Sequence, residues 1–335
     1  MSRIDIAFDR RTTSHMSLGM TTYTRKLEAL LPQVAPDLCF AFVGEGDNFD
    51  RAEQLDLPFT LARLRPRLAH IPTPFAPLLM PVPFVLTIHD LIDLEYPQFG
   101  KRRVGPYFRY GVGPLARRAR VVITDDDATI GALHAHLGVD PTRVRVVALG
   151  VDAPVAAPVA PCERPYFLNV GNHRPHKNVA ALVRAWAHLP AELEVDLLLT
   201  GTNDVGDAFV GLQRERGNLV FLGTRSDAEL MAYYQAAAAY VHPALREGFG
   251  LPLLEAMRAG TPVIAAHGAL PRVLAPHAYA FEPDDSEELG ELLRSALTDP
   301  ATFRRGASAA QAATAELTWE RTASATAAIY RELLA

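Results

Sequence analysis

Short apolar runs alternate with amphipathic stretches along most of the chain, and this alternation is the main indication of its fold. In the first half, runs rich in Val, Ile, Leu and Phe predict buried strands at residues 4–8, 38–43, 84–88, 121–124 and 145–149, with 59–64 as a further candidate. In the second half, similar runs predict strands at residues 166–170, 195–199, 219–222, 240–243, 262–265 and 278–281. The segments between them have helical spacing, as at 17–31, and the end is helical from about residue 287. Regular strand–helix alternation in each half predicts an α/β protein of two doubly wound, Rossmann-like domains.

The segment APVAAPVAP, residues 153–161, separates the two halves. Its three prolines among small residues follow neither a helical nor a strand period, so we expect a semi-rigid linker. This places an N-terminal Rossmann-like domain at residues 1–152 and a C-terminal Rossmann-like domain at residues 162–315. Two domains also fit a chain of 335 residues, because a single hydrophobic core rarely grows that large.

Composition and charge exclude several classes of function. The net charge of -5 gives no overall attraction to nucleic acid. The two cysteines, Cys39 and Cys162, lie far apart, so neither a disulfide framework nor a cysteine metal site is expected. The first residues lack the apolar core of a signal peptide, and prolines interrupt the longest apolar stretch, residues 76–88, so we expect a cytoplasmic protein. The glycine fingerprints of dinucleotide dehydrogenases and P-loop enzymes are missing from suitable contexts, as is the GxSxG elbow.

Residues 246–264, REGFGLPLLEAMRAGTPVI, predict a glycine loop, a short helix and a buried strand. Pro252 stands in the first turn of the helix, where no backbone donor is needed, and Gly260 ends it. The unpaired N–H groups at the start of such a helix suit an anion such as a diphosphate. Carboxylates repel phosphate, so we expect Glu247 and Glu255 to accept hydroxyl groups on either side of it, from the sugar and the ribose respectively. The alternative for Glu255 is a favourable interaction with the helix dipole.

Polar side chains also follow two other predicted strands. After residues 166–170 come Arg174 and Lys177, just before a helix that Asn178 can cap. Two cations at this place match the needs of a diphosphate, although a basic surface loop without a ligand has the same composition. Strand 84–88 ends at His89, and ligand residues gather at the carboxyl ends of parallel strands. A lone histidine there is alternatively a structural hydrogen-bonding residue.

These segments resemble the retaining glycosyltransferases of family 4, which have the GT-B fold and include mannosyltransferase-like members. The string E-G-F-G-L-P-x-x-E, from Glu247 to Glu255, is similar to the family's E-x7-E signature, and V-G-x-x-x-P-x-K, residues 170–177, to its diphosphate-binding segment. The resemblance recurs in chain order from Ser17 to the C-terminus. One position departs from it: many members have arginine directly after the glycine, where this chain has Asn172, and Arg174 is a candidate to replace it.

The resemblance implies a role for each site residue. Glu247 would orient the donor sugar, His89 would contact it, and Lys177 would neutralise the leaving diphosphate, which makes these three the implied catalytic residues. The implied donor-binding residues are Gly19, Gly171, Arg174, Lys177, Gly223, Thr224, Phe249, Gly250, Leu251 and Glu255. Residues 316–335, which include Trp319, are implied to form a closing helix that packs back on the N-terminal domain.

Residues 101–120 carry seven cations and no acidic residue. A solvated helix face explains them; the sharper alternative is a rim for an anionic acceptor or a peripheral contact with the inner face of a membrane. Asp125 to Asp127 are interpreted as a helix cap and not as a metal-binding D-x-D motif, so no metal is expected.

The combined interpretation is a metal-independent, retaining transfer of a hexose from a nucleotide-diphosphate sugar to a hydroxyl of a glycan, lipid-linked or small-molecule acceptor. The resemblance favours mannose, and the nucleotide sugar is a co-substrate, with no cofactor expected. Three alternatives stay open: an inverting GT-B transferase or nucleotide-sugar epimerase in which His89 is a base, a non-catalytic sugar-nucleotide-binding subunit, and an NAD-dependent enzyme. The sequence leaves the base, the sugar, the acceptor and the oligomeric state open.

Overall fold

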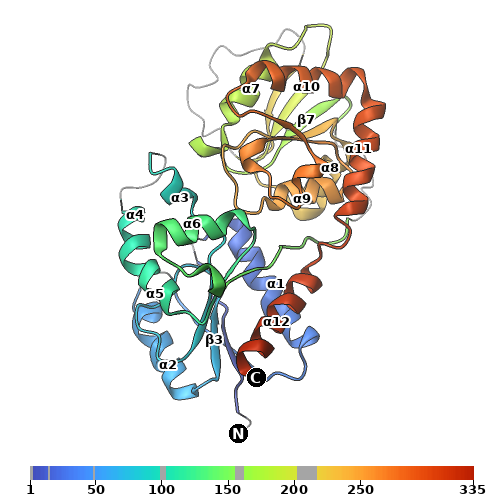
Figure 1. The fold of residues 1–335 in the computed structure, drawn as a ribbon. Helices are drawn as coiled ribbons and strands as arrows, with labels where there is room; N and C mark the ends of the chain where they lie inside the picture. The colour runs from blue at the N-terminus through green and yellow to red at the C-terminus, as the bar shows by residue number, and fades with distance from the viewer. Residues whose placement is uncertain (1–2, 14–15, 48–49, 99–102, 155–161, 202–216) are drawn as a thin grey trace. The chain divides into compact units, whose positions relative to one another are not determined.

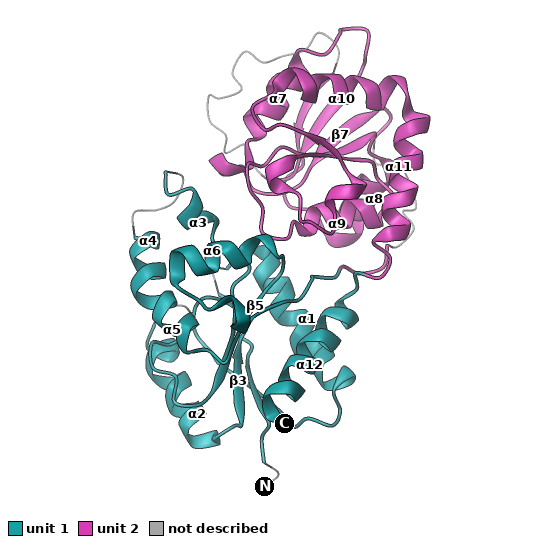
Figure 2. Ribbon diagram, in the orientation of Figure 1, with its two compact units in different colours: residues 1–150, 317–335 teal, residues 151–316 magenta. Residues whose placement is uncertain are grey.

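The computed structural model describes residues 3–13, 16–47, 50–98, 103–154, 162–201 and 217–335. The chain forms two compact units, residues 1–150 with 317–335 as unit 1 and residues 151–316 as unit 2 (Figure 2). Most of the expected linker, residues 155–161, lies outside the described residues, so the linker stays a prediction.

Unit 1 is built on a six-stranded parallel sheet with the order β2-β1-β3-β4-β5-β6. The strands are β1 Ile6–Asp9, β2 Phe40–Val43, β3 Leu68–Ile71, β4 Phe84–Thr87, β5 Val121–Thr124 and β6 Val144–Val146. The helical elements are α1 Leu18–Val34, the π-helix η1 Ala52–Asp56, α2 Leu57–Leu64, α3 Ile92–Glu95, α4 Val104–Tyr107, the π-helix η2 Phe108–Val112, α5 Gly113–Arg118, α6 Ala128–Leu137, the 3-10 helix η3 Pro141–Arg143 and α12 Trp319–Leu334. Strands β1, β3, β4 and β5 are buried along their whole length, as is typical of parallel sheets, and most of them therefore read as continuous apolar runs.

One predicted element of unit 1 is wrong. Residues 59–64, the candidate strand, belong to helix α2, which begins at Leu57 and has a proline in its first turn. Leu57 and Leu61, one helical turn apart, are buried, whereas Phe59 is 71% exposed; this is the period of a helix and not of a strand. The strand at this place in the sheet is β3, the four-residue segment LAHI, which the apolar pattern did not reveal.

The C-terminal helix α12 belongs to unit 1, where it lies alongside α1 (Figure 1). A buried polar chain ties it to the sheet: His70 on β3 contacts the Tyr330 hydroxyl of α12 through Nδ1 (2.5 Å) and Thr87 of β4 through Nε2 (2.8 Å). Burial lowers the pKa of His70 to about 3, so this side chain is neutral and both contacts are hydrogen bonds without a charge on the ring. Gly150 lies so close to the start of α12 that a Cβ there would be 2.0 Å from the Thr318 backbone.

Unit 2 repeats the architecture with the parallel strand order β12-β11-β10-β7-β8-β9. Its strands are β7 Tyr166–Asn169, β8 Asp196–Leu199, β9 Leu219–Phe221, β10 Ala239–His242, β11 Val263–Ala266 and β12 Tyr279–Phe281. Its helical elements include the 3-10 helix η4 Pro175–Lys177, α7 Val179–Ala187, α8 Asp227–Ala236, α9 Leu251–Arg258, the 3-10 helices η6 His267–Ala269 and η7 Ala275–His277, α10 Ser286–Thr298 and α11 Pro300–Ala313. The predicted pair of doubly wound α/β domains is confirmed.

Two helix starts differ from the sequence-based expectation. Asn178 does precede α7, but it adopts the left-handed φ of 51° and its side-chain amide donates to the Pro283 carbonyl (3.3 Å), so it does not cap the helix. Gly19 does not precede α1 but lies inside its first turn, because the helix begins at Leu18 and Ser17 caps it. Among the residues that the structure describes, none of the helices has the length and apolarity needed to cross a membrane.

Candidate active site

The strand order of unit 2 brings two of the predicted motifs together. From β7 the chain passes to β8 and β9 on one side of the sheet and then returns to β10 on the other side of β7. In open parallel sheets, ligands bind outside the carboxyl ends of the strands at such a switch point. The loop after β7 carries Gly171, Arg174 and Lys177, and the loop after β10 carries Glu247 and Gly250. The two motifs therefore meet at the place where the fold favours a ligand.

Lys177 and Glu247 form an ion pair at this switch point. The Lys177 ammonium donates to Glu247 Oε2, and the two side chains are only 17% and 15% exposed. The Nε2 atom of His242, at the end of β10, lies 3.0 Å from the same oxygen. Burial acts to raise the pKa of Glu247, but Lys177 and His242 outweigh it and hold that pKa well below its usual range. Glu247 is therefore ionised at neutral pH, and since both bonds fall on Oε2, its Oε1 is left for a ligand.

Helix α9 begins directly beside this ion pair. Its N-cap is Gly250, with a left-handed φ of 75°, and no side chain caps the helix. A Cβ on Gly250 would lie 2.7 Å from Leu253 Cδ1 and 3.2 Å from Glu247 Cγ, so a side chain there would be strained and would press on the carboxylate. Pro252 has no N–H, and the N–H groups of Leu253 and Leu254 donate to the Gly250 carbonyl (2.9 and 3.2 Å), which leaves the N–H of Leu251 for an anion.

Glu255 lies in α9, one turn after its start, and accepts a hydrogen bond from the Tyr234 hydroxyl of α8 at 3.0 Å. Burial raises the pKa of this carboxyl, although the Tyr234 bond opposes the change. A desolvated carboxylate with one oxygen held by a tyrosine suits a neutral hydroxyl partner better than a solvated surface role.

The remaining predicted donor-binding residues of unit 2 differ in exposure. Arg174 is exposed, and its backbone N–H bonds the side chain of Asn172 (3.3 Å), so Asn172 shapes this loop. Gly223 has a φ of 68° and pairs with Gly201 through an isolated antiparallel bridge, while Thr224 is exposed. Phe249 is buried, with 3% of its surface exposed. None of these observations tests a donor contact, so their roles stay predictions.

In unit 1, the ends of the adjacent strands β4 and β5 pair a histidine with a carboxylate. His89 Nδ1 lies 2.7 Å from Asp125 Oδ2, and both side chains are buried. Burial acts to lower the pKa of His89, but the negative charge of Asp125 outweighs it and raises that pKa. The Nε2 atom of His89 is buried without a hydrogen-bond partner, as is Asp125 Oδ1. A buried histidine with one nitrogen held and the other unused is suited to a ligand.

Asp125 was therefore misread as part of a helix cap. The N–H of Ala128 bonds Asp126 Oδ1 at 2.8 Å, and Asp127, at the N-cap position of α6, makes no side-chain cap bond. The strand-end rule that selected His89 applies equally to Asp125, which directly follows β5. His242 was not predicted either, because it is the last residue of β10 and the rule selects residues that follow a strand.

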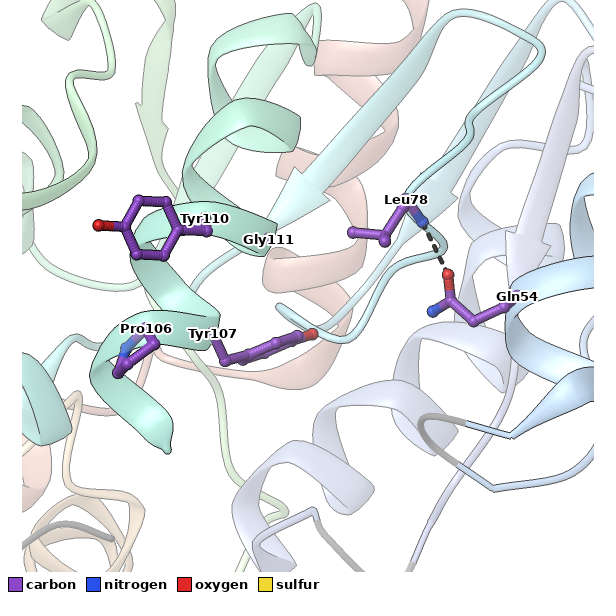
Figure 3. Close-up of a pocket in the computed structure, with 6 residues that line it drawn as sticks. All are labelled: Gln54, Leu78, Pro106, Tyr107, Tyr110 and Gly111. Carbon is purple, nitrogen blue, oxygen red and sulfur yellow. Dashed lines mark hydrogen bonds between the residues drawn. The ribbon is translucent and has the colours of Figure 1, made fainter. Parts of the chain in front are cut away.

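Unit 1 also contains an open pocket of about 510 Å³, lined by Gln54, Leu78, Pro106, Tyr107, Tyr110 and Gly111 (Figure 3). The backbone N–H of Leu78 donates to Gln54 Oε1 (3.1 Å), which joins the loop after β3 to η1. Leu78 is 54% exposed and Tyr110 is 74% exposed. The pocket residues come from segments that follow β2, β3 and β4, so the pocket lies at the carboxyl edge of the sheet.

The basic segment 101–120 contributes to the same pocket through α4 and η2. Its described arginines are all exposed: Arg103, Arg109, Arg117, Arg118 and Arg120. Lys101 and Arg102 lie outside the described residues. Neither the solvated face nor the contact with an acceptor or membrane is tested by these positions. Within the described part of the chain, no group of three or more His, Cys, Asp or Glu side chains is arranged to hold a metal ion, and metal independence stays a prediction.

Two doubly wound parallel sheets in one chain define a GT-B protein, and solved structures agree. The chain superposes on sucrose-phosphate synthase from Thermosynechococcus elongatus with a TM-score of 0.75 at 21% identity, covering 99% of each chain. It superposes on Anabaena HepE in complex with UDP and glucose with a TM-score of 0.74 at 20% identity, covering 98% of this chain and 99% of that one. At these sequence identities, the similarity to both structures shows a shared fold.

Family models match both halves of the chain. Glycosyltransferase Family 4 matches residues 22–154, and Glycosyl transferases group 1 matches residues 156–313. The chain belongs to the family 4, group 1 glycosyltransferases.

Curated relatives cover the chain only in part. The serotype-specific mannosyltransferase WbdA of Escherichia coli is 33% identical over 169 residues, which are 47% of this chain and 20% of WbdA. The MMP alpha-(1->4)-mannosyltransferase of Mycolicibacterium hassiacum is 32% identical over 230 residues, 66% of this chain and 56% of the relative. The matches thus span between a fifth and just over half of these relatives.

Proposed function

We propose that the chain is a retaining glycosyltransferase that transfers a hexose, with mannose as the first candidate, from a nucleotide-diphosphate sugar to a hydroxyl acceptor. The observation that carries the proposal is the Lys177–Glu247 pair beside the uncapped start of α9. The pair puts a cation and an ionised carboxylate at one switch point, beside the backbone N–H of Leu251 at the start of α9. A donor that joins a diphosphate to a sugar needs these three partners. The family and the mannosyltransferases among its relatives support the same choice.

In this proposal Lys177 and the start of α9 stabilise the leaving group. An ammonium has three donors, and Glu247 takes one, so two are left for phosphate oxygens. As the bond between the sugar carbon and the phosphate oxygen breaks, negative charge builds on the β-phosphate, and donors already in place lower the barrier. Arg174, exposed on the same loop, adds a second cation. Protein cations then supply what a metal supplies elsewhere.

Glu247 orients the sugar and does not act as the base. A carboxylate whose pKa is held well below its usual range is a poor proton acceptor, but it accepts hydrogen bonds from sugar hydroxyls well. The proton of the attacking hydroxyl passes to the leaving phosphate oxygen as the new bond forms on the same face of the sugar. Glu255, with one oxygen held by Tyr234, accepts from the ribose.

The acceptor is proposed to use the pocket of unit 1. Leucine and tyrosine side chains line it, and the segment that supplies its tyrosines also carries exposed arginines, so it suits an acceptor with an apolar part and an anionic part, such as a lipid-linked glycan. Such an acceptor would bring the protein to the inner face of a membrane from the cytoplasm. Substitution of Tyr110 by Ser should raise the KM for a lipid-linked acceptor and leave the KM for the donor unchanged.

Thermal stabilisation tests the donor site. UDP, GDP, ADP, dTDP and CMP are compared with and without magnesium, and a ligand that binds only the folded state adds about 2.7 kcal/mol at a hundredfold excess over its Kd. We expect one nucleoside diphosphate to stabilise the protein without metal. HepE was solved with UDP, so UDP is tried first. If no diphosphate stabilises the chain, the proposed donor site is wrong.

The His89–Asp125 pair favours one rival, an inverting transferase. Asp125 holds Nδ1, and the unused Nε2 is placed as the accepting nitrogen of a general base is. The anomeric configuration of the product, read from proton NMR coupling constants at early times, separates the two reactions. Retention supports the proposal, and inversion would assign the base to His89.

A further inference from the structure

Beneath Glu247 lies a buried pair of side chains that the proposed chemistry does not use. Tyr240 and His242 both point from β10, and they are 0% and 2% exposed. The Tyr240 hydroxyl lies 2.7 Å from His242 Nδ1, and His242 Nε2 lies 3.0 Å from Glu247 Oε2. Both ring nitrogens of the histidine are thus engaged, one toward the sheet and one toward the site.

The chemistry of the three groups fixes the direction of both hydrogen bonds. Glu247 is an ionised carboxylate and only accepts, so His242 must carry its proton on Nε2 and donate. Burial lowers the pKa of His242, although Glu247 opposes this, and the ring is therefore neutral. Its Nδ1 then carries no proton and accepts a hydrogen bond, and the Tyr240 hydroxyl is the donor. Burial also raises the pKa of Tyr240 well above its usual value, so the hydroxyl keeps its proton.

We propose that His242 is a positioning residue for Glu247, held in its Nε2–H tautomer by Tyr240, so that Glu247 Oε1 faces the donor sugar. This inference rests on the proposed function. Lys177 alone does not fix the carboxylate, because a lysine stem is flexible and its ammonium must also follow the departing phosphate. A neutral donor from a rigid strand fixes Oε2 without adding charge, and it keeps holding the carboxylate when the Lys177 ammonium shifts toward the diphosphate.

The neighbouring carboxylate has a related support. Tyr234 bonds Glu255 and packs edge to face against Tyr240, with ring centroids 5.6 Å apart. The residues that support the two carboxylates are therefore in contact with each other through one buried aromatic pair.

The test replaces the histidine and asks which function is lost. His242→Gln keeps an N–H donor near the position of Nε2, whereas His242→Leu removes it. We expect His242→Leu to lower kcat with the preferred donor, GDP-mannose or UDP-glucose, about 10- to 100-fold, the effect of one lost hydrogen bond to a charged group. The affinity for the nucleoside diphosphate alone should not change, because Glu247 contacts the sugar. His242→Gln should recover most of the rate.

Tyr240→Phe provides a second variant that keeps the ring and the burial. It should lower kcat, but by less than His242→Leu does. The nitrogen-15 NMR signal of His242 Nδ1 should also shift, because this nitrogen no longer accepts a hydrogen bond from Tyr240. Tyr166→Phe is the matched control, because this tyrosine is also buried in the sheet and bonds only the Tyr233 carbonyl (2.8 Å). It should leave kcat unchanged.

Three results would overturn the inference: a folded His242→Leu protein with the wild-type kcat, equal losses in the Leu and Gln variants, or a wild-type Nδ1 that carries the proton. If the wild-type chain transfers no sugar at all, the proposed function fails instead. The NMR assignment of the tautomer still tests the Tyr240–His242 part of the inference in that case, so the two failures are distinguishable.

Discussion

Removing the charge of Lys177 tests the site most directly. Lys177→Met keeps the length of the side chain and leaves Glu247 as an ionised, mostly buried carboxylate. Breaking a buried pair in this way costs about 3–5 kcal/mol. His242 still donates to Glu247, so we expect the lower end, about 3 kcal/mol of the unfolding free energy of unit 2. In turnover, loss of the cation should lower kcat about 100- to 1000-fold.

The chain contains a convenient probe for this measurement. It has two tryptophans, and Trp186 lies in α7 of unit 2, whereas Trp319 lies in α12 of unit 1. In a Trp319→Phe background, urea unfolding followed by fluorescence reports on unit 2 alone. Glu247→Gln completes a double-mutant cycle. Without the carboxylate charge, Lys177→Met no longer leaves a buried charge unpaired, so it should destabilise unit 2 less. Lys177→Met should cost at least about 1 kcal/mol less in the Glu247→Gln protein; costs that agree within about 0.5 kcal/mol would refute the ion pair.

The pH dependence of the same variant has a defined sign. In the wild type, the pKa of Glu247 is lower in the folded state than in the unfolded state, where it is about 4.3. The carboxylate therefore contributes fully to the free energy of unfolding above pH about 4.3, and this contribution is lost as the pH falls through the folded-state pKa. Without Lys177 one of the two groups that lower this pKa is lost, and the folded pKa of Glu247 rises relative to the wild type. The stability difference between wild type and variant should therefore be largest at neutral pH and shrink on acidification. A difference that does not change with pH would contradict this account.

Three further predictions concern other groups. Glu255→Gln should reduce the thermal stabilisation by the preferred nucleoside diphosphate, since its carboxylate is proposed to accept from the ribose; equal stabilisation of both proteins would exclude that role. Asp125→Asn should lower the pKa of His89, because burial then acts without the opposing charge, and an unchanged NMR titration of His89 would contradict this. Tyr330→Phe leaves His70 without its Nδ1 partner and should cost unit 1 about 1–3 kcal/mol by urea unfolding, whereas a loss below about 0.5 kcal/mol would make that bond unimportant.

The apolar pattern predicted most of the fold because parallel strands are buried on both faces. It failed at residues 57–71, where α2 exposes Phe59 and β3 is a four-residue segment that contains His70. In a segment this short, a helical and a strand period explain the same apolar residues, and only the buried positions decide between them. The structure provides those positions, and the sequence does not.

Features that depend on the backbone were predictable where one residue type is needed. Gly250 and Gly260 both adopt positive φ, 75° and 77°, at the two ends of α9, as glycine before and after a short helix indicates. Asn178 shows the limit of such reasoning, since a residue that commonly caps a helix bonds a distant carbonyl here. A cap needs the right φ as well as the right side chain.

Pairs of side chains from different strands were not predictable, and the strand order is the reason. A sequence shows which residues follow a strand, but not which strands are neighbours. β7 and β10 are neighbours although β8 and β9 lie between them in the chain, and this alone brings Lys177 to Glu247. β4 and β5 are neighbours in unit 1, which brings His89 to Asp125. The same reasoning predicts that any change that moves β10 relative to β7 will disturb the Lys177–Glu247 pair before it disturbs α9, because the pair spans the two strands and the helix follows only one of them.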